Sequence, residues 1–546
     1  MKKFHLLLLS ALSGILFSLG WPVNGFPGFL FLAFVPLFYI EDFISKNKND
    51  FSKFSVLFYV YPAFFIWNIL TTYWIVYSTG FGMIMAVAFN SLFMAICFNV
   101  YHITKRVLYS DKQAYFILIF YWICFEYLHL DWDLSWTWLH LGNGFASYHK
   151  WIQWYEFTGV FGGTLWVILV NIFVYKLLRK LKALSDKRSL IISSFLVAAL
   201  ILVPIIISFI IYYSYEEKKQ AVEIVVIQPN VDPYNEQYDL LPEAAINMIL
   251  DLAREEVNSS TDFVIAPESS IQPNFNIGER IWESEIRYFR SIDSLEVFVN
   301  KYPGLTFVIG ASTRKIFKED EKISSSARKF IDTERYYDAF NTAVFIESPK
   351  QLELYHKSKL TPGVEKMPFP KLLKPLESFA IDLGGTIGSL GIDAEPKVYN
   401  TLNDSIKIAA IICYESVYGE FVSEFVKNGA NIIFVITNDG WWGNTPGYKQ
   451  HFSFSVLRAI ETRRSIARSA NTGISAFINQ RGDVLHETKY WVKDVIKREL
   501  NLNSKKTVYV NYGDYIGRIC SLISILFILI TISMGLVKRK QISVKN

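Results

Sequence analysis

The sequence predicts a membrane protein that joins a bundle of about eight spanning helices to one large α/β domain outside the bilayer. The first observation is composition: 51% of the 546 residues are hydrophobic, 16% are aromatic and only 19% are charged. The mean hydropathy of +0.24 is too high for an ordinary soluble domain. The second observation is distribution, because the long apolar stretches lie at the two ends of the chain and none lies within 214–516.

Eight apolar stretches each approach the ~20 residues that a helix needs to cross a bilayer. They cover approximately 4–20, 25–41, 53–77, 80–104, 114–130, 157–178, 189–213 and 517–536. We therefore expect a seven-span domain over 1–213, a soluble domain over 214–513, and a last span with its tail over 514–546. A cleaved signal peptide is an alternative for the first stretch, but we expect a retained span because more spans follow at once.

The placement of lysine and arginine predicts the orientation. Basic residues gather before the first stretch, in alternate connections after it, and after the last stretch, whereas the other turns are poor in positive charge. Basic loops of a membrane protein stay in the cytoplasm. Both termini are therefore predicted to be cytoplasmic, with the large domain on the opposite side.

The soluble segment contains short apolar runs that predict strands, among them VEIVVIQ, TFVIGAS and NIIFVIT. Most runs are continuous rather than alternating, which indicates strands buried on both faces. Helical segments over 242–257 and 448–468 lie between them, so we expect an α/β fold or a layered α+β sandwich. The stretch 363–395 predicts an amphipathic arm, either mobile or packed on the domain.

One of the four cysteines lies outside the apolar stretches. Cys413 follows small and β-branched residues, Ala409 to Ile412, which predict a buried strand, and a predicted helix begins at Ser416. A thiol at such a turn is open to substrate and faces the positive end of the helix dipole, which favours the thiolate. We expect a reactive thiol here, although an isolated cysteine is more often a small core residue.

Two further strand ends supply matching chemistry. Glu268 closes the run FVIAPE, and Lys357 follows a strand-like run in YHKSKLTPGVEKMP. If these ends meet Cys413, Glu268 can accept the thiol proton as a general base. Lys357 can then support the thiolate and stabilise the oxyanion that forms when it attacks an acyl carbonyl. Each residue alone is weak evidence, but the three in this order are specific.

The Glu–Lys–Cys order resembles that of the nitrilase, or carbon–nitrogen hydrolase, superfamily. Together with the apolar stretches it resembles the apolipoprotein N-acyltransferase family within that superfamily, over nearly the whole chain. The further motifs that support the resemblance are IQPN (227–230), the lysine segment (355–368), TNDGWWG (437–443), QHF (450–452) and ARSANTGISAFINQRGD (467–483).

The resemblance implies an α-β-β-α sandwich with Glu268, Lys357 and Cys413 as the catalytic triad, and Glu365 as a second glutamate that supports the lysine. It implies a two-step transfer: Cys413 takes an acyl chain from a membrane phospholipid as a thioester. The α-amino group of a diacylglyceryl-cysteine at a lipoprotein N-terminus then removes it. The implied enzyme is a monomer of the bacterial inner membrane that needs neither a cofactor nor a metal.

Four further positions take roles from the resemblance. Tyr414 and Glu415 match the two residues after the nucleophile that the family also requires. Trp442 falls where the family has an aromatic residue lining the acyl site. Tyr238 is the nearest counterpart of an arm tryptophan after the IQPN motif. Neither the acyl chain nor the headgroup can be inferred from these positions.

Two other functions compete with acyl transfer. A membrane-anchored amidase or nitrilase would use the same triad with water as the second nucleophile, although it needs at most one anchor. A transporter or receptor would show ionisable residues inside its spans, of which Glu126 is the main candidate. The histidines show no metal-ligand spacing, and a net charge of +5 does not suggest a nucleic-acid partner.

Overall fold

The computed structural model describes residues 3–109, 114–237, 239–331, 333–348, 351–369, 389–402 and 405–543. The chain divides into two compact units. One combines Met1–Ser214 with Tyr512–Asn546, and we call it the helical unit. The other, Tyr215–Asn511, is the sandwich unit.

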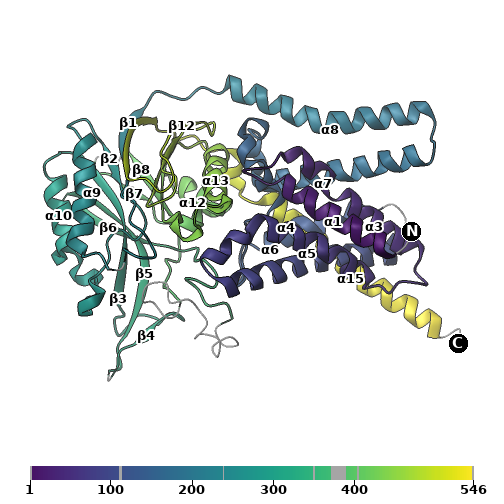
Figure 1. Ribbon diagram of the computed structural model, residues 1–546, viewed down its shortest axis with the longest axis horizontal. Helices are drawn as coiled ribbons and strands as arrows, with labels where there is room; N and C mark the ends of the chain where they lie inside the picture. Colours follow the sequence, from purple (N-terminus) through teal and green to yellow (C-terminus); the bar gives the residue numbers. More distant parts are fainter. Residues whose placement is uncertain are drawn as a thin grey trace. The chain divides into compact units, whose positions relative to one another are not determined.

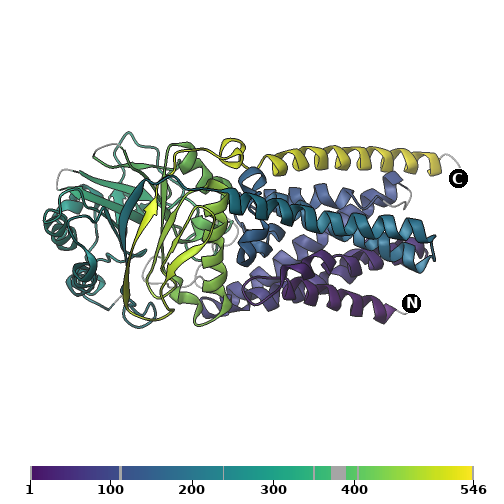
Figure 2. The ribbon, with the colours of Figure 1, turned by 90° about the horizontal axis from the view of Figure 1, so that it is seen from above.

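The helical unit consists of α-helices joined by turns and by one longer connection, residues 129–154, which contains the 3-10 helix Leu141–Trp151. Its long helices run roughly along a common direction (Figure 2). The helices are α1 (Lys3–Leu19), α2 (Leu30–Ala33), α3 (Val35–Lys46), α4 (Ser55–Thr72), α5 (Gly80–Tyr109), α6 (Ile117–Leu128), α7 (Tyr155–Lys182), α8 (Lys187–Ser214) and α15 (Tyr515–Ser543).

Six helical segments of the described chain are long and apolar enough to cross a membrane. They are Pro27–Lys46, Ser55–Tyr77, Gly80–Tyr109, Tyr155–Lys182, Lys187–Ser214 and Tyr515–Lys538. Two further apolar helices, α1 and α6, are shorter. The most apolar stretch of α8 has no buried residue. Its side chains therefore need an apolar surrounding, which a bilayer supplies.

A buried ionic network joins α3 to α5 inside the helical unit. The ammonium group of Lys105 bonds both Glu41 and Asp42, the latter at 2.9 Å. His102, one turn earlier on α5, contacts Glu41 through Nδ1 at 2.8 Å. Lys105, Glu41 and His102 are fully buried. Charges in such a place are tolerated only when they compensate one another.

The same network extends to α7. Tyr175 donates to Asp42 at 2.7 Å, and Arg179 lies 3.1 Å from the same carboxylate oxygen. The sequence did not predict this network. The fourth apolar stretch was expected to end at residue 104, which leaves Lys105 in the following loop, and Glu126 was the ionisable candidate. The helix α5 instead extends through Tyr109 and buries Lys105.

The sandwich unit contains two sheets. The first has strand order β13-β1-β2-β3-β5-β4, with β6 also paired to β5, and the second has order β12-β11-β10-β9-β8-β7. The strands of the first sheet are β1 (Ala221–Gln228), β2 (Phe263–Ile265), β3 (Thr306–Ile316), β4 (Arg328–Lys329), β5 (Tyr336–Ser348), β6 (Gln351–His356) and β13 (Asp494–Asn501). The strands of the second are β7 (Tyr399–Asn400), β8 (Lys407–Ile412), β9 (Ile432–Thr437), β10 (Ile466–Ala470), β11 (Ala476–Ile478) and β12 (Val484–Glu487).

Helices cover the outer face of each sheet, so the layers run helix, sheet, sheet, helix (Figure 1). The helices α9 (Pro242–Glu256) and α10 (Arg290–Val299) bury an apolar core against the first sheet. The helices α12 (Gly419–Lys427) and α13 (Pro446–Thr462) belong to the other outer layer. The predicted α-β-β-α sandwich is confirmed. Continuous apolar runs form its central strands, and every residue of β9 is buried.

Breaking the ionic network should destabilise the helical unit. Lys105→Met leaves Glu41 buried without its ammonium partner, which should cost about 3–5 kcal/mol of unfolding free energy, as for other broken buried ion pairs. The measurement is thermal unfolding of the detergent-solubilised protein, with the exposed Lys182→Met as the matched control. Lys105→Met combined with Glu41→Met should recover most of the loss. A single variant as stable as the wild type would contradict the compensating role.

Candidate active site

The three residues of the expected triad stand just after three strands of the sandwich unit. Glu268 follows β2, Lys357 follows β6 and Cys413 follows β8. Glu268 and Lys357 therefore come from the first sheet and Cys413 from the second. The structure brings all three together, because the charges of Glu268 and Lys357 both act on the Cys413 thiol.

A buried ammonium ion between two carboxylates forms the centre of the site. Lys357 Nζ lies 3.1 Å from Oε1 of Glu268 and 2.8 Å from Oε1 of Glu365. Asn341 on β5 donates to the same two oxygens, at 2.7 and 3.0 Å. The second oxygen of Glu268 accepts the backbone N–H of Asn438 at 3.0 Å, just beyond β9 of the other sheet. Glu268 is thus fixed from both sheets.

The charges of Lys357, Glu268 and Glu365 determine the protonation states of Lys357 and Glu365. Burial by itself lowers the pKa of Lys357, but the carboxylates of Glu268 and Glu365 outweigh burial and hold that pKa well above its ordinary value. Burial by itself raises the pKa of Glu365, and the Lys357 ammonium holds it below its ordinary value instead. The lysine is therefore a fixed cation at neutral pH, suited to stabilising a developing negative charge.

Close packing of the backbone positions Glu268. A Cβ atom at Gly310 of β3 would lie 2.5 Å from both the Glu268 Cα and the Ser269 nitrogen. These are backbone atoms that cannot rotate away, so position 310 accepts only glycine without displacement. Ser269 itself has a φ of +55°, a strained conformation for a side chain with a Cβ.

Cys413 occupies a sharp turn from β8 into a short 3-10 helix, Cys413–Val417, with a φ of +50°. Such a turn presents the side chain above the strand ends. The thiol is half-buried. Its pKa is raised above the ordinary value, first by burial and then by the charge of Glu268, against the lowering effect of Lys357. The expectation that the helix dipole favours the thiolate is wrong for the free protein: a helix of five residues supplies little dipole, and burial dominates.

Glu415 links the lysine segment to the cysteine turn. Its Oε1 accepts hydrogen bonds from the Tyr355 hydroxyl and the Ser358 N–H, each at 2.6 Å. Its Oε2 accepts the Ile412 N–H at 2.8 Å. Burial raises the pKa of Glu415 to about 7, although these donors oppose the rise. Tyr414 is buried and packs edge-on against Tyr418, with ring centroids 5.4 Å apart.

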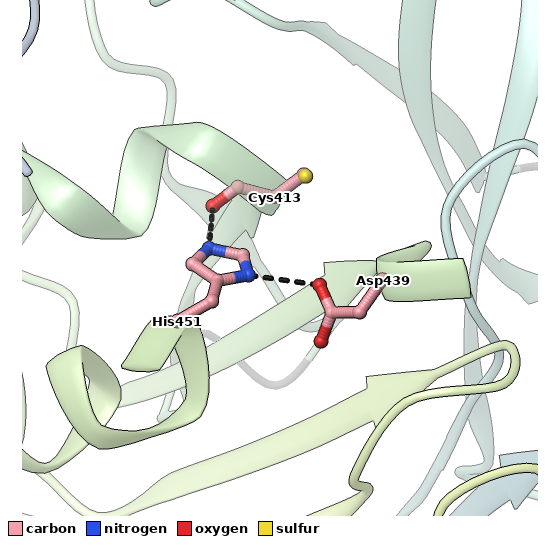
Figure 3. Close-up of side chains that lie close together, drawn as sticks. All are labelled: Cys413, Asp439 and His451. Atoms are coloured by element: carbon pink, nitrogen blue, oxygen red, sulfur yellow. Dashed lines mark hydrogen bonds and ion pairs between the residues drawn. The ribbon is translucent and has the colours of Figure 1, made fainter. Parts of the chain in front are cut away.

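A second set of buried polar side chains contacts the backbone of Cys413. His451 on α13 contacts the Cys413 carbonyl oxygen through Nε2 at 3.1 Å and Asp439 through Nδ1 at 2.8 Å, while the sulfur points away from the ring (Figure 3). Arg468 on β10 donates to Asp439 at 2.6 Å. Cys413, Asp439 and His451 lie close enough together to hold a metal ion. The guanidinium of Arg468 already compensates the carboxylate, which disfavours a second cation there. Chemistry without a metal stays a prediction.

Of the two aromatic residues expected to contact substrate, the structure describes Trp442 but not Tyr238. Trp442, at the end of the 3-10 helix Asp439–Trp442, is half-buried and meets the His451 ring edge-on at 5.5 Å. Tyr238 lies outside the described residues, as do residues 370–388 of the expected arm. Sequence reasoning missed Asn341, whose role could have been suspected from an amide side chain inside the mostly apolar run FNTAVFIE.

The site and the sandwich together define a class. The family described as "Carbon-nitrogen hydrolase" matches residues 216–508, more than half of the chain. The chain belongs to the carbon–nitrogen hydrolase family. Residues 13–173 match a second family, described as "Apolipoprotein N-acyltransferase N-terminal domain". The resemblance to that membrane-associated branch is therefore confirmed.

Curated relatives extend over almost the full length. An apolipoprotein N-acyltransferase of Chlorobaculum tepidum is 27% identical over 533 residues, which cover 95% of this chain and 94% of the relative. Apolipoprotein N-acyltransferase 1 of Treponema denticola is 25% identical over 571 residues, covering 98% of each chain. Among solved structures, Nit3 of Saccharomyces cerevisiae, from the nitrilase superfamily, is 14% identical with a TM-score of 0.37, covering 52% of this chain and 93% of that one.

The environment of the thiol predicts an unusual pH profile. Because burial and Glu268 raise its pKa, alkylation of Cys413 by iodoacetamide should keep accelerating beyond pH ~8.5, where a free cysteine titrates. Glu268→Gln removes one of the raising charges and should move the profile to lower pH. Peptide mass mapping reports alkylation at Cys413, and the exposed Glu334→Gln is the control. A wild-type midpoint at or below pH 8.5 would contradict the assignment.

Proposed function

We propose that this chain is an acyltransferase that moves a fatty acyl chain from a membrane phospholipid to the α-amino group of the diacylglyceryl-cysteine of an apolipoprotein. The observation that supports it most directly is the buried Lys357 between Glu268 and Glu365, beside a half-buried thiol. The membrane half of the chain supports a lipid substrate over a soluble one. The names and coverage of the curated relatives support the same activity.

The first step makes the acyl-enzyme. Glu268 takes the proton of the Cys413 thiol as the sulfur attacks the ester carbonyl of the phospholipid. Since the free thiol has a raised pKa, this proton transfer has to accompany the attack. Lys357 stabilises the oxyanion, and Glu365 keeps the lysine charged and oriented. The C–O bond then breaks, Glu268 returns its proton to the glycerol oxygen, and a lysophospholipid leaves.

The second step transfers the chain. The uncharged α-amino group of the acceptor attacks the thioester carbonyl, again with its oxyanion beside Lys357. Glu268 accepts a proton from the attacking nitrogen and passes it to the departing sulfur, which restores the Cys413 thiol. Glu415 and Tyr414 hold the cysteine turn, and Trp442 lines the acyl site; Tyr238 is assigned a similar role by position alone. No cofactor enters this scheme.

The proposed membrane arrangement has eight spans. The six long apolar segments supply six, and the shorter helices α1 and α6 supply the others. Seven spans then fall in 1–213 and the last in 514–546, with 214–513 as the catalytic domain. The basic residues of alternate connections favour cytoplasmic termini and a catalytic domain on the outer side of the bacterial inner membrane. We propose that a single copy suffices.

The acyl-enzyme is the direct test. Wild-type protein incubated with a phospholipid should gain the mass of one acyl chain on Cys413, lose it with hydroxylamine, and pass it to a diacylglyceryl peptide. Cys413→Ala should gain nothing, because the nucleophile is gone, whereas the matched control Cys124→Ala should behave as wild type. Intact and peptide mass spectrometry report each species. A folded wild type without an adduct would contradict the proposal, and free fatty acid without acylated peptide would indicate a hydrolase.

Gly310→Ala tests the placement of the base. The added methyl group would press on the Glu268 Cα and the Ser269 nitrogen. It should lower the rate of thioester formation by about a hundredfold, as expected when a catalytic group moves by about 1 Å. Stopped reactions analysed by intact mass give the rate, and Gly535→Ala, which meets open space, is the control. An unchanged rate would show that Glu268 need not be held this closely.

A further inference from the structure

Three arginines lie along the sheet face that holds the catalytic residues. In the β3–β5 ladder Ser312 pairs with Asn341, and Arg314 pairs with Ala339. In the β4–β5 ladder Arg328 pairs with Tyr337. Directly opposed residues point to the same side of a sheet, and so do every second residues along a strand. Arg314 and Arg328 therefore share the face of Asn341, which bonds Glu268 and Glu365.

The strand register also gives the distances of these arginines from the catalytic centre. Ala339, opposite Arg314, lies about 7 Å along β5 from Asn341, and Tyr337, opposite Arg328, lies about 13 Å away. The third arginine, Arg280, precedes a segment that pairs with β3: the Arg314 N–H donates to the Ile281 carbonyl at 2.8 Å. We call Arg280, Arg314 and Arg328 the arginine strip. In Figure 1 the paired strands β3 and β5 run toward β4 at the end of the sheet.

Aromatic side chains hold Arg314 in place. The Arg314 guanidinium lies over the Tyr337 ring, 5.4 Å from its centroid. Trp282 packs edge-on against Tyr337 at 5.7 Å, and Phe330 lies 4.7 Å from Tyr337. Guanidinium planes on aromatic rings keep their outward N–H groups free to bind a ligand. The Arg314 guanidinium therefore rests on a packed aromatic cluster.

The positive charge of Arg314 is poorly compensated. Among the described residues, the Arg314 side chain makes its cation–π contact with Tyr337 but no hydrogen bond or ion pair. The acids near Arg314 make other contacts: Glu283 accepts from His356 and Thr313, and Asp338 accepts from Ser324 while its charge acts on Arg328. Burial, and then the charges of Arg280 and Arg328, lower the pKa of Arg314 to about 10. Half-buried guanidinium groups that repel one another are stabilised by a bound anion.

We propose that the arginine strip binds the phosphodiester of the phospholipid acyl donor, an inference that rests on the proposed function. Arginine matches phosphate oxygens in charge and geometry. In a phospholipid, only the glycerol backbone separates the phosphate from the ester carbonyls. An ester carbonyl at Cys413 therefore places the phosphate a short distance from the catalytic centre, and the strip begins at that distance on the same face. The strip thus selects donors by their phosphate and orients the ester.

The test compares two donors with the same acyl chains, dipalmitoyl phosphatidylglycerol and dipalmitoylglycerol, which lacks the phosphate. Arg314→Gln should slow thioester formation on Cys413 from the phospholipid by about tenfold, the loss expected for one charge-assisted contact. The rate with the phospholipid divided by the rate with dipalmitoylglycerol should fall accordingly. Arg314→Lys, which keeps the charge, should slow the phospholipid reaction less. The exposed Arg290→Gln, whose side chain is 86% accessible, is the matched control and should leave both rates unchanged.

The outcomes separate the two proposals. If wild type forms no thioester from either donor, the proposed function fails. If it forms one but the donor ratio is the same in wild type and Arg314→Gln, only the phosphate site is overturned, and the strip is left to another partner such as an acidic peptide. Inorganic phosphate is added as a competitor. Inhibition of wild type but not of Arg314→Gln shows that the site also binds free phosphate. If Arg314→Gln lowers the ratio of the two donor rates but phosphate does not inhibit the wild type, the site binds phosphate only within a lipid.

Discussion

The burial of one ammonium ion constrains the sandwich unit more than any other interaction. Lys357 is almost completely inaccessible to water, so its charge is tolerable only between the carboxylates of Glu268 and Glu365. Those carboxylates are in turn held by Asn341 on one sheet, and Glu268 also by the Asn438 N–H on the other. The two sheets therefore have to close at a defined register for the cluster to form. The position of the base relative to Cys413 follows from the same closure.

The sequence predicted most of this architecture because the relevant patterns are local. Continuous apolar runs identify buried strands, and long apolar stretches identify candidate spans. The α9 helix was expected over 242–257 and covers Pro242–Glu256, whereas α13 ends at Thr462, before the predicted 468, because Ile466 already belongs to β10. Glu268, Lys357 and Cys413 could be found because each stands at the end of a strand-like run.

The missed features depend on contacts between distant segments. Asn341 looked like one polar residue inside a strand, and only the pairing of β5 with β6 brings it to Lys357. Lys105 looked like a loop charge until α5 proved long enough to bury it against Glu41. The thiol pKa was misjudged for a similar reason: a sequence shows that a helix follows Cys413, but not that it has five residues, nor how deeply the sulfur is buried. Register, helix length and desolvation are properties of the folded chain.

The two buried lysines share one electrostatic pattern, and Arg314 departs from it. Lys105 and Lys357 are each buried against two carboxylates, so their charges are compensated within the chain. Arg314 is half-buried, yet among the described residues its side chain contacts only the face of the Tyr337 ring. Arg314 thus differs from these lysines, and it lies on the face that leads to the catalytic cluster. An anion supplied from outside completes the pattern, and a substrate that carries a phosphate beside its reacting ester supplies it at each turnover.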